Sequence, residues 1–408
     1  MQASRKALAF VLVTIFIDAL GIGIVFPLMP DLMARVGAGD TAAGALWAGA
    51  LMAAYAAMQL LFSPVVGGLS DAHGRRPVLL LALLALALDY ALMALAQSFW
   101  LLLVGRLVAG AAGASYITAS AYVADITPPE RRAARFGLIG ATYGIGFVMG
   151  PALGGMLGAW NITAPFWAAA GLSALNFAFG LMVLPESLPP DRRRPFARAD
   201  LNPFAVILRA FRLPGLALPL LMLFVFEFTN MVYPTLWAFW TRETFGWSAA
   251  LIGLSLSAYG VGVALTQGAL LPGLVRRTGE YRTLIFSVGA AIVALTGLGL
   301  ATQSWMVFAL MPLACLADMA PPTASAMMAN IVDEDRQGVL QGVIAALGSV
   351  AAIVAPLLLT PLFHLFAAEG AALRAPGAPF LASAALLLLA FPGFLALGRR
   401  RGARAPLP

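Results

Sequence analysis

Long apolar stretches alternate with short polar segments along the whole chain. A helix needs about 20 mostly apolar residues to cross the hydrocarbon core of a bilayer, and each stretch has roughly that length. The pattern therefore predicts an all-α integral membrane protein with twelve transmembrane helices. The predicted spans are 8–30, 44–66, 78–96, 99–122, 135–157, 164–184, 214–240, 249–271, 283–302, 304–328, 338–363 and 378–398.

The composition agrees with a protein whose solvent is lipid. Only 11% of the 408 residues are charged and 61% are hydrophobic, whereas a typical soluble domain carries about 25% charged residues. If successive spans cross the membrane in opposite directions, most of the 25 Lys and Arg residues lie on the same side of the membrane as the two termini. Because positively charged segments stay in the cytoplasm, this predicts cytoplasmic termini. We expect a multi-pass protein of the bacterial cytoplasmic (inner) membrane. The net charge of +7 follows this bias and does not indicate a nucleic-acid partner.

Few residues are suited to enzymatic chemistry. The single cysteine, Cys315, lies inside a predicted span, and one Cys cannot make a disulfide framework or a Cys-based metal cluster. No nucleotide-binding loop and no nucleophile–base pair is visible in the sequence. We therefore expect no enzymatic activity, no metal and no cofactor.

The two halves of the chain are related by a constant shift of 205 positions. The landmarks that coincide are Gly74 with Gly279, Trp100 with Trp305, and Pro151 with Pro356. Matches at one offset indicate an internal duplication. We predict two pseudo-symmetric six-helix bundles, 1–184 and 214–408, joined by a cytoplasmic linker at 185–213 that is rich in Pro and Arg.

The turn between the second and third spans carries a conspicuous motif. It reads Gly-x-x-x-Asp-x-x-Gly-Arg-Arg, formed by Gly67, Asp71, Gly74, Arg75 and Arg76. The motif resembles the loop signature of the major facilitator superfamily. That resemblance implies a transporter with two six-helix halves and a substrate site between them near the middle of the membrane.

The same resemblance implies a role for these residues in conformational gating. Asp125, at the cytoplasmic end of the fourth span, is expected to pair with Arg75. Asp71 is expected to meet the positive end of the helix that begins near Gly338 when the carrier is open outward. Ala72 departs from the basic residue that is usual at its position, which weakens the expected latch.

The fifth span is rich in glycine around a proline. Gly146, Gly150, Pro151 and Gly154 lie on it with a spacing that resembles the antiporter motif of the drug-efflux branch. Glycines let neighbouring helices approach closely, and a proline kinks a helix. The alternative is a helix that is merely well suited to close packing.

Further motifs resemble the tetracycline/proton antiporter family. They are Asp18-Ala-Leu-Gly-Ile-Gly, Leu88-Asp89-Tyr90, Gly105-Arg106-Leu107 and the segment 332–338. The resemblance implies export of a drug-like molecule in exchange for protons by alternating access, and hence antibiotic resistance. However, Ala291 and Val263 stand where that family has an acid in the ninth span and a histidine in the eighth. We therefore expect that tetracycline is not the best substrate.

Charged residues within the spans are candidates for proton coupling. A charge at the bilayer centre costs at least about 2.5–3.5 kcal/mol on insertion scales. Burial favours the neutral form of a carboxyl group, and a nearby cation favours the charged form, which suits a proton carrier. Asp18 is either a cavity group or the partner of an arginine, whereas Asp89 is favoured as a structural partner. The candidates are Asp18, Asp89, Glu227 and Asp318.

Arg106 and several polar or aromatic residues are candidates for lining the substrate cavity. Arg106 has no acid one turn away in its own helix, so its partner has to come from another helix. Trp237 also suits an interfacial aromatic belt, because it lies near a span end. The cavity candidates are Tyr55, Gln59, Arg106, Tyr116, Asn230, Tyr233, Trp237 and Tyr259.

These observations predict a monomeric antiporter whose partners are protons, a small molecule and the lipid bilayer. A proton-coupled importer or a facilitator of a small nutrient is the alternative, and a non-transporting receptor is a remote one.

Overall fold

The computed structural model describes residues 2–113, 115–194, 196, 215–333 and 337–402. In these ranges all regular elements are helical, and twelve helices are long and apolar enough to cross a membrane. The predicted fold class is therefore confirmed. Residues 197–213 of the predicted linker and 334–336 of the motif at 332–338 lie outside the described residues.

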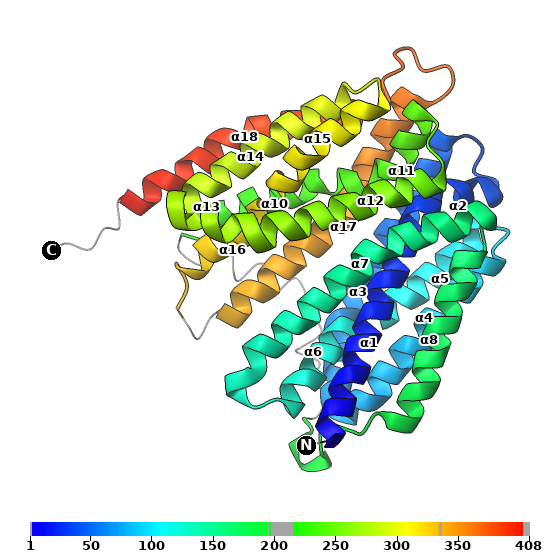
Figure 1. The fold of residues 1–408 in the computed structure, drawn as a ribbon, viewed down its shortest axis with the longest axis vertical. Helices are drawn as coiled ribbons and strands as arrows, with labels where there is room; N and C mark the ends of the chain where they lie inside the picture. Colours follow the sequence, from blue (N-terminus) through cyan, green and yellow to red (C-terminus); the bar gives the residue numbers. More distant parts are fainter. Residues whose placement is uncertain (1, 114, 195, 197–214, 334–336, 403–408) are drawn as a thin grey trace. The chain divides into compact units, whose positions relative to one another are not determined.

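The chain forms two compact units, which are coloured in chain order in Figure 1. Unit 1 consists of Met1–Pro203 with Trp247–Gly260, and unit 2 consists of Phe204–Gly246 with Val261–Pro408. The segment 247–260 groups with unit 1 because the first part of helix α12 packs against a helix of that unit.

Unit 1 contains six spans. Its helices are α1 (Gln2–Val25), α2 (Met29–Arg35), α3 (Thr41–His73), α4 (Arg75–Leu95), α5 (Phe99–Ala112), α6 (Ser115–Ile126), α7 (Pro129–Trp160), α8 (Ala164–Val183) and the start of α12 (Ala249–Leu265). Side chains close the free ends of two helices. The Asp40 carboxylate accepts from the Ala43 N–H at the start of α3, and Ser98 does the same for Leu101 at the start of α5.

Helices α1 and α7 lie side by side in unit 1 (Figure 1) because glycines remove the side chains between them. A Cβ atom at Gly146 would lie 2.6 Å from the Phe16 carbonyl oxygen, and one at Gly150 would lie 2.5 Å from that of Leu20. A Cβ atom at Gly154 would likewise lie 2.5 Å from the Ile24 carbonyl oxygen. The glycine-rich span thus brings two backbones into direct contact.

Unit 2 contains the remaining spans. Its helices are α10 (Ala217–Asn230), α11 (Val232–Phe245), the end of α12, α13 (Leu271–Thr278), α14 (Glu280–Gly299), α15 (Ser304–Ala317), α16 (Ala320–Ala329), α17 (Gln337–Ala367) and α18 (Ala378–Gly402). Helix α18 lies beside α14 (Figure 1).

The duplication is visible in the two matching turns. Gly74 separates α3 from α4 with φ +104°, and Gly279 separates α13 from α14 with φ +79°. Both values lie where a Cβ atom would strain the backbone, so glycine is required at both positions. The repeated landmark therefore marks the same turn in each half.

Several predicted spans are interrupted, which the apolar pattern did not show. The seventh span breaks at Met231, between α10 and α11, and the tenth breaks at Asp318 and Met319, between α15 and α16. Pro321 and Pro322 explain the second break, because proline can begin a helix but cannot continue the preceding one. The eighth span contains a π-helical turn at Thr266–Leu270.

Candidate functional site

A buried ion pair lies between α4 and α5 in unit 1. The Arg106 guanidinium pairs with the Asp89 carboxylate, and these side chains are 13% and 1% exposed. The partner that Arg106 required from another helix is therefore Asp89. A second contact runs from Arg106 to the Met93 sulfur at 3.2 Å. The neighbouring Gly105 leaves room for the pair, since a Cβ there would lie 2.8 Å from an Asp89 oxygen.

Two side chains of α3 lie next to this pair. The Arg106 guanidinium sits over the Tyr55 ring at 5.3 Å, a cation–π contact. One turn along α3, the Gln59 amide donates to the Gly113 carbonyl at 3.2 Å. That carbonyl lies where α5 ends and would otherwise lack a helical partner. The structure thus brings together three of the predicted cavity residues, Tyr55, Gln59 and Arg106.

Asp18 lies half-buried on α1, in an aromatic environment. Its carboxylate interacts electrostatically with Tyr55, Tyr90 and Tyr143. Tyr143 of α7 contacts Tyr116 of α6 edge to face, with ring centroids 5.8 Å apart. Phenol groups from three other helices, α3, α4 and α7, therefore lie within electrostatic range of Asp18.

A second polar cluster lies in unit 2, at the helix breaks. The Asn230 amide of α10 donates to the Asp318 carboxylate at 3.0 Å, and the Gln267 amide of the π-helical turn donates to the Asp318 backbone carbonyl at 2.9 Å. Glu227 lies one turn before Asn230 and interacts electrostatically with Asp318. Thr266 adds a bond to the Cys315 carbonyl at 3.1 Å. The two acids, Glu227 and Asp318, thus meet where three spans deviate from α-helical geometry.

The aromatic candidates of unit 2 are buried by packing. Tyr233 and Trp237 are 7% and 5% exposed. Their rings lie 6.0 Å apart, and Tyr233 meets Phe380 of α18 at 6.0 Å, while Trp240 meets Phe380 at 4.6 Å. Tyr259 is half-buried on α12. Within unit 2, Tyr233 and Trp240 therefore join α11 to α18, and Trp237 packs against both of these rings.

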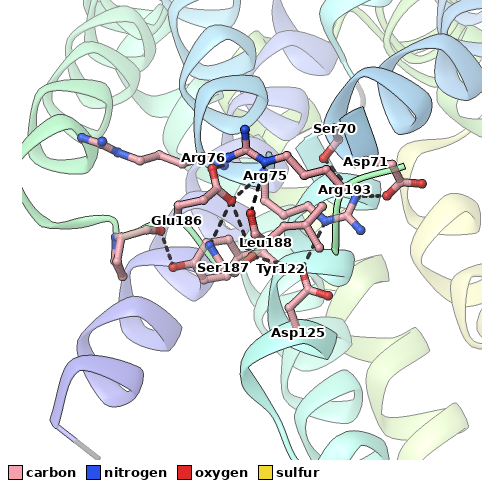
Figure 2. A network of polar contacts seen from close by, with 11 residues as sticks. Ser70, Asp71, Arg75, Arg76, Tyr122, Asp125, Glu186, Ser187, Leu188 and Arg193 are labelled. Carbon is pink, nitrogen blue, oxygen red and sulfur yellow. Dashed lines mark hydrogen bonds and ion pairs between the residues drawn. The ribbon is translucent and has the colours of Figure 1, made fainter. Parts of the chain in front are cut away.

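The gating motif forms a polar network at the start of α4 (Figure 2). Arg75 pairs with Asp71 one turn earlier, bonds Asp125 at 3.2 Å and donates to the Ser70 hydroxyl at 3.1 Å. Gly67 lies one turn before Asp71 and has open space beside its Cα. The expected contact between Arg75 and Asp125 is present within unit 1.

Sequence reasoning missed Glu186, which lies just after α8 and holds this network together. Its carboxylate accepts from the backbone N–H groups of Arg75 at 2.8 Å and Arg76 at 3.2 Å (Figure 2). It also accepts from Ser187 and Leu188, at 2.9 and 3.0 Å. Helix α4 has no side-chain cap of its own, so the half-buried Glu186 carboxylate serves as its cap from a distant part of the chain.

Other groups fix the same segment to unit 1. The Arg76 guanidinium donates to the Leu181 carbonyl at 2.8 Å, and the Tyr122 hydroxyl donates to the Pro185 carbonyl at 2.8 Å. Ser187 shares the Asp125 carboxylate with Arg75, at 3.0 Å. The chain that leaves α8 is therefore fastened to the same turn that carries the gating motif.

The described part of the chain contains no group of three His, Cys, Asp or Glu side chains placed to hold a metal ion. The polar groups described above within the spans include carboxylates, amides, phenols, hydroxyl groups and the Arg106 guanidinium. Such groups can bind and release protons and can hydrogen-bond a polar part of a small molecule.

The comparison with protein families decides the classification. The model described as Major Facilitator Superfamily matches residues 11–356 and 222–407. This chain belongs to the major facilitator superfamily. The family suggested by the loop motif and by the duplicated halves is thereby confirmed.

Relatives and solved structures agree with this classification. The chain is 39% identical to the tetracycline resistance protein, class C, of Escherichia coli, over 98% of each chain. It is 37% identical to the class G tetracycline resistance protein of Vibrio anguillarum, over 88% of this chain and 91% of the relative. The crystal structure of the human organic anion transporter MFSD10 matches with a TM-score of 0.69 and 25% identity, over 96% of this chain and 99% of that one.

Proposed function

We propose that this chain exports an amphipathic, drug-like molecule across the bacterial inner membrane in exchange for protons, with Asp18, Glu227 and Asp318 as the coupling acids. The hydrogen bond between Asn230 and Asp318 is the observation on which the proposal depends. It joins the acid at the break of the tenth span to the residue just before the break of the seventh. The relationship to tetracycline resistance proteins supports drug efflux. Protons are the coupling ion expected of this branch.

The polar cluster of unit 2 suits a proton site for a physical reason. Two carboxylates near one another in a poorly solvated place cannot easily both be charged, so one tends to hold a proton. Glu227 and Asp318 are only half-buried, so modest changes in water access change the balance between the two forms. Interrupted helices supply this access, because their backbone groups can line a cavity.

This cluster would replace the coupling groups expected from the family. Ala291 on α14 is buried and has no titratable side chain, and Val263 on α12 is equally unable to carry a proton. We propose that the coupling site has shifted to Glu227 and Asp318. Asp18 provides the acid of unit 1, while Asp89 is engaged with Arg106 and serves as a structural partner.

The substrate is proposed only as a class. Phenol rings and amides near Asp18, Tyr55 and Gln59 favour a molecule with flat apolar surface and a few polar groups. Tetracycline fits this class and is named by the relatives, but the shift of the coupling acids leads us to expect a better substrate than tetracycline.

The orientation and assembly are proposals as well. The excess of Lys and Arg in the segments that begin near Arg75, Arg131 and Arg192 favours a cytoplasmic location for both termini. We propose that one chain is sufficient for transport, since each unit carries its own polar cluster.

Growth of an efflux-deficient host that expresses this chain tests the substrate class. A panel should include tetracycline, other amphipathic antibiotics and cationic dyes. We expect resistance to at least one compound, which everted vesicles accumulate when a pH gradient is imposed and lose when a protonophore is added. Uptake that does not depend on the pH gradient would indicate a facilitator. High-level tetracycline resistance that is abolished by mutations in the cavity would contradict the expected substrate preference.

A further inference from the structure

Helix α7 contains Pro151, and a side chain of α12 bonds the α7 backbone on both sides of this proline. In a regular helix the Ala152 N–H would donate to the Val148 carbonyl four residues earlier. Here the Ser257 hydroxyl of α12 bonds both groups. It accepts from the Ala152 N–H at 3.1 Å and donates to the Val148 carbonyl at 2.5 Å. A side chain inserted into the ladder of another helix is a recognised cause of a kink.

The insertion is possible because α12 and α7 touch at the level of their backbones. A Cβ atom at Gly253 would overlap the Pro151 carbonyl oxygen, and one at Gly155 would overlap that of Ala249. Residues 249, 253 and 257 recur every four positions, so they share one face of α12. Ser257 is the member of this face that carries a hydroxyl group.

The other end of the same span reaches the acid cluster of unit 2. The π-helical turn Thr266–Leu270 follows α12 directly, and its Gln267 donates to the Asp318 carbonyl at 2.9 Å. Ser257 and Gln267 are about 15 Å apart along a helix that rises 1.5 Å per residue. A π-helical turn within a span is frequently found at functional sites. One span therefore contacts the α7 kink with one residue and the proposed proton site with another.

We propose that Ser257 is a positioning residue for transport, because its hydroxyl holds the α7 backbone in a kinked conformation. Through this contact, a movement of α12 caused by protonation of the acid cluster changes the conformation of α7. This inference rests on the proposed function, because it needs Glu227 and Asp318 to be the groups that take up the proton. When the cluster is protonated, the Gln267 contact changes, α12 shifts, and Ser257 transfers the shift to the backbone of α7. Without the hydroxyl, the Ala152 N–H can bond the Val148 carbonyl directly. Helix α7 then no longer responds to a shift of α12.

Removing the hydroxyl should leave the fold intact. In Ser257→Ala, the two freed backbone groups of α7 satisfy each other, so no buried polar group is stranded. Ser255→Ala is the matched control, because Ser255 is buried on the same helix and its hydroxyl donates to Ile252 of its own helix at 2.7 Å. Both variants lose one hydroxyl group of equal size, but the Ser257 hydroxyl bonds two backbone groups of α7, whereas the Ser255 hydroxyl bonds the backbone of its own helix.

The test measures how a reporter on α7 responds to pH, and it needs no substrate. The reporter is Gly140→Cys in a Cys315→Ser background, since Gly140 is exposed with open space around it. A maleimide labels the purified full-length protein in lipid nanodiscs at pH 5.5 and pH 8. Each rate is divided by that of the SDS-denatured protein at the same pH, which removes the intrinsic reactivity of the thiol.

We expect the normalised rate to change about fivefold between the two pH values, which is the effect of one hydrogen bond. Ser257→Ala should reduce that change to less than about twofold, while Ser255→Ala should retain it. A rate that is independent of pH in the parent protein, or a Ser257→Ala variant that responds like the parent, would overturn the inference. If Asp318→Asn and Glu227→Gln keep the full response while Ser257→Ala loses it, the proposed acids are wrong and the relay begins elsewhere.

Discussion

The ion pair between Asp89 and Arg106 allows a quantitative prediction about stability. We consider Arg106→Gln, which removes the positive charge and keeps a polar side chain of similar length. Asp89 would then remain on α4 with its side chain 1% exposed and no cation beside it. Removing one member of a buried pair leaves an uncompensated charge, and such changes typically cost about 3–5 kcal/mol.

The size of the effect follows from the difference between a buried and an exposed pair. Arg374 pairs with Glu243 at 2.6 Å in unit 2, but its side chain is 61% exposed. Pairs accessible to water contribute about 0–1 kcal/mol. Arg374→Gln is therefore the matched control, because the same substitution breaks an arginine–carboxylate pair that is exposed to water.

The assay is the free energy of unfolding in mixed micelles titrated with SDS, monitored by helical circular dichroism. We expect Arg106→Gln to lower the stability by about 3–5 kcal/mol and Arg374→Gln by less than about 1 kcal/mol. The double variant Asp89→Asn with Arg106→Gln should recover most of the loss, because no buried charge then remains. Equal effects of the two single variants, or a double variant no more stable than Arg106→Gln, would refute the assignment of this pair as structural.

Three further substitutions test other parts of the account. Glu186→Ala should speed hydrogen exchange at the Arg75 amide, because that N–H group loses its acceptor, at a cost of about 1–2 kcal/mol; unchanged exchange would contradict the cap. Gly150→Ala should reduce folded protein by size-exclusion chromatography, because its methyl group would meet the Leu20 carbonyl, whereas Gly144→Ala, with open space, should not. Asp71→Asn should increase the labelling of cysteines placed on the cytoplasmic side, by favouring the inward-open state, and equal labelling would reject that role.

Much of the fold could be predicted from hydrophobicity alone. The twelve spans and the turn at Gly74 follow from segment length and from the need of one backbone position for glycine. The partner of Arg106 could be predicted as a residue of another helix, since its own helix offers none. Which acid it was depended on how α4 and α5 pack, and no spacing within a single helix contains that information.

The features that the sequence did not reveal are those created by packing. A break at Met231 or Asp318 leaves the apolar composition of a span unchanged, so hydropathy cannot detect it. Ser257 resembles any serine of an apolar helix until α7 is placed against it. Glu186 is separated from the turn that it caps by more than 100 residues, and only the folded chain joins them.

The central claim is that transport is driven by protons bound at Asp18 together with Glu227 or Asp318. The most direct measurement compares Asp18→Asn, Glu227→Gln and Asp318→Asn with the unmodified protein in proteoliposomes, using a compound that the panel shows to be exported. Amides keep the size of the side chains but cannot cycle a proton. The account predicts loss of gradient-driven accumulation with retained exchange at equilibrium for Asp18→Asn and for at least one of the other two. Accumulation at the unmodified rate in all three variants would contradict it and would direct attention to Asp89.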